Sequence, residues 1–129
     1  VDVVMGAETG SGKTLAYLLP TFHKVLQAKR NEDPNDEAMQ WQKYPRAIVL
    51  VPNRDLCEQA ARMADAISAA LPQENLNLDE EEYVDPPVTV MALSGSDKEW
   101  PFRPRLPAPD ILVCTPKLLR QFVRDLQLF

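Results

Sequence analysis

Cysteine and histidine are scarce in this sequence, and each shortage excludes a class of protein. Among 129 residues there are two cysteines, Cys57 and Cys114, and one histidine, His23. So few cysteines exclude a disulfide-rich secreted scaffold, and a lone histidine without nearby cysteines excludes the usual zinc-site spacing. Because both cysteines stand in apolar periodic segments, we expect buried free thiols and an intracellular, reducing compartment.

Long hydrophobic runs are also missing. No apolar stretch reaches the roughly 18–20 residues that span a bilayer, and the N-terminus lacks the pattern of a signal peptide. Hydrophobic residues make up 45% of the chain and charged residues 26%. That balance predicts one soluble domain with a real core and no membrane partner.

Basic residues are outnumbered, with a net charge of −5, but the acidic residues are concentrated. Residues 31–37 hold four acids and residues 74–85 hold six, with no lysine or arginine in either stretch. The rest of the chain carries nine acidic and fourteen basic residues, and is therefore basic. We expect polar, solvated insertions near 30–45 and 73–87 on a body that can bind phosphate.

Apolar segments alternate between strand-like and helix-like patterns. Strands are predicted at 1–5, 46–52, 88–94 and 110–116, and helices at 13–30, 53–71 and from 117 onward. This alternation predicts an α/β fold, a parallel sheet in a three-layer αβα arrangement. The apolar run 46–52 is typical of a strand covered on both faces.

Three local signals refine these elements. Asn53 is expected to cap the second helix, and Pro20 to kink the first. The segment between 95 and 109 is rich in proline and is expected to be irregular. Since the sequence starts within a strand pattern and stops without a helix-end signal, we expect a piece of a larger domain.

The stretch "AETGSGKT", the phosphate loop hereafter, stands between the first strand and the first helix. Gly10 and Gly12 permit a tight turn whose amide groups, with the helix N-terminus, form an anion site. Lys13 would reach the β- and γ-phosphates of a nucleotide, and Thr14 would help to hold Mg²⁺. The strict phosphate-loop pattern has glycine where Ala7 stands, a substitution that an ordinary backbone conformation tolerates.

Hydrolysis in such sites also uses an acidic residue at the end of another buried strand. The other strand ends read Pro52-Asn53, Ser94-Gly95 and Thr115-Pro116, and none of them is acidic. The acid is therefore expected to come from sequence beyond Phe129.

Four motifs in order resemble the N-terminal RecA-like domain of DEAD-box ATP-dependent RNA helicases. The phosphate loop resembles motif I, and "VPNRDLCEQ" resembles motif Ia. The stretch "LSGS" resembles the short glycine motif, and "DILVCTPKLL" resembles motif Ib, whose core in the family is T-P-G-R. The resemblance covers nearly all of residues 1–129 outside the acidic insertions. It implies an incomplete P-loop NTPase domain, because the Q, D-E-A-D and S-A-T motifs are absent.

The resemblance also implies the site residues and the partners. Lys13 and Thr14 would be the catalytic residues, and Thr14 would contact the metal through the nucleotide. The whole ATP and Mg²⁺ site would comprise Ala7, Glu8, Thr9, Gly10, Ser11, Gly12, Lys13 and Thr14. The RNA contacts would comprise Pro52, Asn53, Arg54, Gly95, Thr115, Pro116 and Lys117. The RNA contacts would be sequence-independent and share no residue with motif I, and a second RecA-like domain of the same chain would complete the enzyme.

Motif Ib departs from the family pattern, with Lys117 in place of glycine and Leu118 in place of arginine. Two other classes stay open. A different P-loop enzyme, such as a small-molecule kinase, would share the phosphate loop. A catalytically inactive helicase-like module would bind nucleotide without turnover.

Overall fold

The structure, a computed structural model, describes residues 1–8, 10, 12–32, 35, 44–71, 88–93 and 108–126. Several predictions lie outside these residues: most of the first acidic stretch, all of the second, and most of the proline-rich segment. Three of the predicted site residues also lie outside: Thr9, Ser11 and Gly95.

Three helices and three strands make up the described part of the chain. In order they are α1 (Lys13–Arg30), β1 (Ala47–Leu50), α3 (Arg54–Ala70), β2 (Val90–Leu93), β3 (Ile111–Cys114) and α4 (Pro116–Leu126). Each overlaps a helix or strand that the sequence predicts. Helix α1 continues through Pro20.

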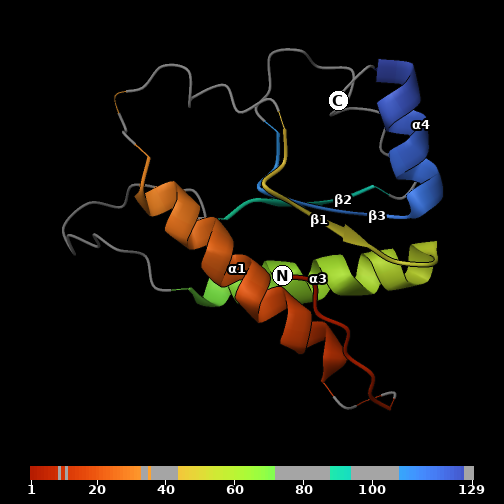
Figure 1. The fold of residues 1–129 in the computed structure, drawn as a ribbon, viewed down its shortest axis with the longest axis horizontal. Helices are drawn as coiled ribbons and strands as arrows, with labels where there is room; N and C mark the ends of the chain where they lie inside the picture. Colours follow the sequence, from red (N-terminus) through yellow and green to blue (C-terminus); the bar gives the residue numbers. More distant parts are fainter. Residues whose placement is uncertain are drawn as a thin grey trace.

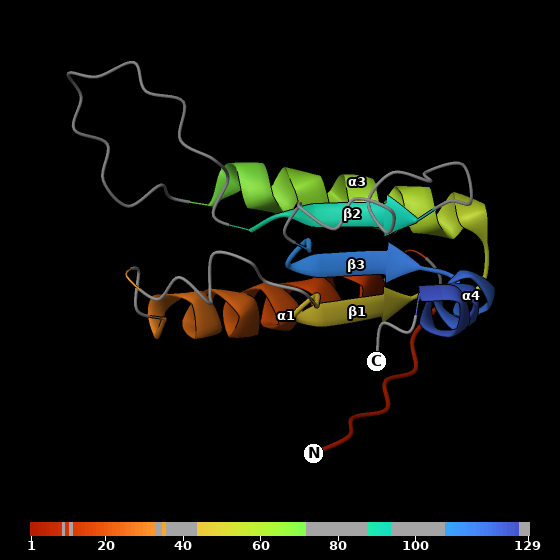
Figure 2. The same cartoon turned by 90° about the horizontal axis from the view of Figure 1, so that it is seen from above.

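The three strands form one parallel sheet in the order β1-β3-β2, so β3 is central. Figure 2 shows the three strands pointing the same way. Helices α1 and α3 lie on one side of the sheet and α4 on the other (Figure 1). The predicted three-layer α/β arrangement is therefore confirmed, and the carboxyl ends of all three strands meet at one edge.

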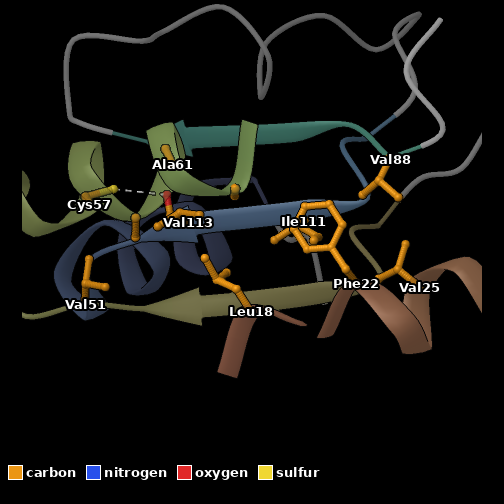
Figure 3. Close-up of a cluster of buried hydrophobic side chains, with 11 residues drawn as sticks. Leu18, Phe22, Val25, Val51, Cys57, Ala61, Val88, Ile111 and Val113 are labelled. Carbon is orange, nitrogen blue, oxygen red and sulfur yellow. Dashed lines mark hydrogen bonds between the residues drawn. The ribbon is translucent and has the colours of Figure 1, made fainter. Parts of the chain in front are cut away.

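The larger core lies between the sheet and the helices α1 and α3. Helix α1 contributes Leu18, Phe22 and Val25, all buried, and these side chains point toward β3 (Figure 3). Helix α3 presents a row of small buried residues to the sheet: Cys57, Ala60, Ala61 and Ala64. Small side chains let this helix approach the strands closely, and the Cys57 thiol donates to the carbonyl of Val113 at 3.3 Å.

A smaller core lies on the opposite face of the sheet. Leu93, Leu112 and Cys114 are buried there. Leu118, Leu119 and Phe122 of α4 pack against them. Every residue of β3 is buried, as its unbroken apolar sequence predicts. Cys57 and Cys114 are both buried and neither forms a disulfide, which confirms the predicted buried thiols.

Two strand predictions are wrong. Residues 1–5 form no strand and are exposed, because within the described residues no neighbouring strand supplies a hydrogen-bonding ladder for them. Strand β1 is not covered on both faces: Ile48 is 38% and Leu50 is 51% exposed. Ile48 and Leu50 lie on the face of β1 opposite the side chains that contact α1 and α3. Helix α4, on that face of the sheet, packs against β2 and β3 and leaves β1 uncovered.

The amino end of the sheet is held by one buried carboxylate, Asp110, which is 3% exposed. Its oxygens accept from Lys29 Nζ at 2.7 Å, from Arg46 Nε at 3.1 Å and from the Thr89 amide at 2.9 Å. Glu32 forms a further ion pair with Arg46. Asp110 thus joins the end of α1 to the starts of all three strands.

No helix in the described residues is long and apolar enough to cross a membrane.

Candidate functional site

The phosphate loop is shaped by two glycines in the left-handed region of backbone space. Gly10 has φ of 80° and Gly12 has φ of 84°. A Cβ atom at either position would meet nothing within 4 Å, so the requirement for glycine comes from the backbone and not from space. Gly12 is the N-cap of α1, and its carbonyl accepts the amide of Ala16 at 3.0 Å.

Lys13 and Thr14 are the first two residues of α1, and both are half-buried. The Lys13 ammonium donates to the carbonyl of Ala7, so the side chain folds back over the start of the loop. The first turn of α1 contains no acidic residue. The positive end of the helix, the ammonium and the loop amides together favour an anion at this place.

A cleft of about 780 Å³ opens beside this loop. It is lined by Gly10, Gly12, Lys13 and Thr14, and by residues of β1 and α3. This volume lies within the range of small-molecule and cofactor sites. Tyr17, Gln59 and Met63 also line the cleft, although none of them belongs to the predicted site. The signal for Tyr17 was its position one helical turn after Lys13, which puts both on one face.

The segment Pro52-Asn53-Arg54 joins β1 to α3 and is exposed. The Asn53 side chain accepts the amide of Leu56 at 2.9 Å, which confirms the predicted helix cap. Its amide nitrogen is a donor not needed for capping. Arg54 pairs with Glu58 one turn along the helix at 3.2 Å, and both side chains are exposed.

The segment Thr115-Pro116-Lys117 joins β3 to α4. Pro116 is the first residue of the helix, the position that proline favours, and the Thr115 hydroxyl accepts the amide of Leu118 at 3.4 Å. Pro116 and Lys117 are exposed, whereas Leu118 is half-buried against the smaller core.

The predicted site residues that the structure describes thus gather at the end of the sheet where the strands end. Pro52 lines the same cleft as Lys13 and Thr14, so the predicted nucleotide and RNA segments adjoin at this residue. Among the described residues no three histidine, cysteine, aspartate or glutamate side chains cluster as a metal site. Thr14 is then the one predicted metal-contacting group in the described part of the chain.

Comparison with known proteins identifies relatives of the whole sequence. The family model described as "DEAD/DEAH box helicase" matches residues 1–128. The DEAD-box ATP-dependent RNA helicase 22 of Oryza sativa subsp. japonica is 36% identical over 125 residues, which are 96% of this chain and 19% of that protein. A probable ATP-dependent RNA helicase of Dictyostelium discoideum is 34% identical over 126 residues, 96% of this chain and 15% of that protein.

The DEAD-box ATP-dependent RNA helicase 39 of Arabidopsis thaliana is 47% identical over 67 residues, 52% of this chain and 10% of that protein. The chain therefore spans a fifth or less of the length of these relatives.

Proposed function

This chain belongs to the DEAD/DEAH box helicase family, and on that premise we propose that it forms the ATP-binding part of an ATP-dependent RNA helicase. The complete protein would bind RNA backbone and use ATP hydrolysis to unwind or remodel RNA. The names of the relatives, which are ATP-dependent RNA helicases, support this activity.

The observation that carries the proposal is the shape of the phosphate loop. Two left-handed glycines precede Lys13 and Thr14 at the start of a long helix, beside a cleft of nucleotide size. The loop amides and Lys13 would bind the phosphates of ATP. Thr14 would contact Mg²⁺, which would neutralise charge that develops on the phosphates.

RNA would bind along the same end of the sheet. Asn53, Arg54 and Lys117 are exposed there, and the first turns of α3 and α4 begin beside them. Helix N-termini and basic side chains bind backbone phosphates, which carry no base information. Binding is therefore expected to be independent of sequence and sensitive to salt.

Hydrolysis would need groups outside these 129 residues. None of the strand ends in the sequence carries the acidic residue that organises Mg²⁺ in related chemistry. A second RecA-like domain of the same chain would supply further groups when ATP draws the two domains together. The 129 residues alone are expected to bind nucleotide without turnover.

The test is ATP hydrolysis by the complete protein, measured with and without mixed-sequence single-stranded RNA. We expect RNA to stimulate turnover in the wild type and in Lys24→Ala, a control on the exposed side of α1. Lys13→Ala should lower kcat by about 10²–10³-fold, the usual effect of removing a group that stabilises developing charge.

Unchanged turnover in Lys13→Ala would refute the assignment of the loop. Hydrolysis that ignores RNA while a metabolite becomes phosphorylated would indicate a kinase. Nucleotide binding with no turnover under any condition would indicate an inactive helicase-like module.

A further inference from the structure

Helix α4 is fixed in orientation by its apolar side. Leu118, Leu119 and Phe122 recur at helical spacing and pack against the smaller core. Because these side chains hold the helix against β2 and β3, the opposite side of α4 is directed away from the sheet.

That opposite side is basic. Lys117, Arg120 and Arg124, the basic face of α4 hereafter, are all exposed. They stand at positions i, i+3 and i+7, so they share one side of the helix over a length of about 10 Å. Among the described residues none of the ion pairs engages them. Lys29, Arg46 and Arg54, by contrast, each have a carboxylate partner.

The basic face starts where the predicted RNA segment ends. Lys117 is both the last residue of that segment and the first cation of the face. The start of α3, with Arg54, lies at the same end of the sheet (Figure 1). Leu118, which replaces an arginine of the motif it resembles, packs inward and cannot meet a phosphate. The cations on either side of it are exposed and can.

We propose that the basic face of α4 is a second RNA-binding surface, on which Lys117, Arg120 and Arg124 contact successive backbone phosphates of single-stranded RNA. This surface rests on the proposed function and extends it beyond the predicted segment 115–117. A row of exposed cations, for which the described residues supply no ion-pair partner, matches a row of phosphates in charge. Arginine can also hold a phosphate with two hydrogen bonds. The contacts position the strand without reading its sequence.

The experiment uses the complete protein with Arg120 and Arg124 both replaced by glutamine. The matched control replaces Lys24 and Arg62 by glutamine, since both are exposed cations on α1 and α3. The Kd for mixed-sequence single-stranded RNA is measured by fluorescence anisotropy over a series of salt concentrations. A third variant, Arg120→Lys with Arg124→Lys, keeps the charge.

The glutamine variant should bind RNA about tenfold more weakly at 0.1 M salt. The slope of log K against log salt should fall by about 0.7 for each lost contact, hence about 1.4 in total. The control and the lysine variant should stay close to the wild type. Equal Kd values for the glutamine variant and the control would overturn the proposal, as would a loss that is the same at every salt concentration.

The outcome separates this inference from the proposed function. If the wild type binds no RNA, the proposed function fails and the surface with it. If the wild type binds RNA and Arg54→Ala weakens it, while the α4 variant matches its control, only the surface on α4 is refuted.

Discussion

The two ends of the sheet use charge in opposite ways. At the amino end Asp110 is buried, and Lys29, Arg46 and Thr89 bind its oxygens. At the carboxyl end Arg54 and Lys117 are exposed, and they stand in the first turns of α3 and α4. The strands therefore begin at a buried ionic cluster and end at exposed polar loops.

The charges at the amino end of the sheet stabilise the fold, whereas those at the carboxyl end are available to bind a ligand. A buried carboxylate whose oxygens already accept hydrogen bonds from neighbouring side chains has no acceptor left for a ligand. Removing one charged residue of such a cluster leaves the opposite charge buried without a partner. Exposed cations and helix N-termini contribute little to stability but remain available to phosphates. Substitutions at the amino end should therefore change stability, and substitutions at the carboxyl end should change binding.

The largest change in stability is expected for Asp110→Ala. Lys29 and Arg46 would lose their buried partner, and removal of one member of such a cluster typically costs 3–5 kcal/mol. Because the Lys29 side chain is 33% exposed, we expect the lower end, about 3 kcal/mol. Urea unfolding monitored by circular dichroism measures it, with Lys13→Ala as the control at the opposite end. Equal losses in the two variants would remove the distinction between the ends.

A second effect on stability is expected at alkaline pH. Burial raises the pKa of the Cys114 thiol to about 11 from an ordinary value of 9.0, and the nearby Cys57 adds to the shift. As the pH rises, the thiol therefore ionises in the unfolded chain before it ionises in the folded one. The contribution of the protonated thiol to the free energy of unfolding is intact below pH 9 and is lost between about pH 9 and 11.

Comparing the wild type with Cys114→Ala across that pH range isolates the thiol, since other ionising groups are common to both. The free energy of unfolding should fall more steeply in the wild type. Parallel pH profiles would show that the thiol does not ionise preferentially in the unfolded chain.

Asn53 combines both roles, because it caps α3 and is predicted to meet RNA. Asn53→Ala should lower the free energy of unfolding by about 1 kcal/mol through loss of the cap. Asn53→Asp keeps an acceptor for the Leu56 amide and should keep most of that stability, while its negative charge weakens RNA binding. Chemical denaturation and RNA titration of both variants would separate the two roles. An aspartate variant as unstable as the alanine variant would contradict the capping argument.

The smallest effect on stability is expected for Arg54→Ala. Its pair with Glu58 is exposed, and such pairs contribute about 0–1 kcal/mol. RNA binding should weaken evenly across sequences, by about fivefold at 0.1 M salt, with a salt slope lower by about 0.7. Glu58→Gln should act in the opposite direction, because it frees the guanidinium. A loss confined to particular RNA sequences would show that Arg54 contacts bases instead of phosphates.

Much of the candidate site could be predicted because its signals are local. Glycine before Lys13, asparagine before α3 and proline at the start of α4 each set the backbone within a few residues. The apolar sequence of β3 likewise predicts its burial. The parallel sheet follows from the alternation of strands and helices.

The features that the sequence did not reveal depend on distant neighbours. Asp110 and Lys29 lie 81 residues apart, and no local pattern announces their contact. The apolar sequence of β1 predicts that Ile48 and Leu50 are buried. They are exposed because α4 packs against β2 and β3 and not against β1. Residues 1–5 have a strand composition, yet a strand needs a hydrogen-bonded neighbour, and composition cannot supply one.

Everything proposed for this chain depends on residues 7–14 forming a phosphate site that requires Lys13. The most direct test of that site is calorimetric titration of the complete protein with ADP and Mg²⁺, for the wild type and for Lys13→Ala. We expect saturable binding by the wild type and its loss in the folded Lys13→Ala variant. Equal affinity in both proteins would contradict it.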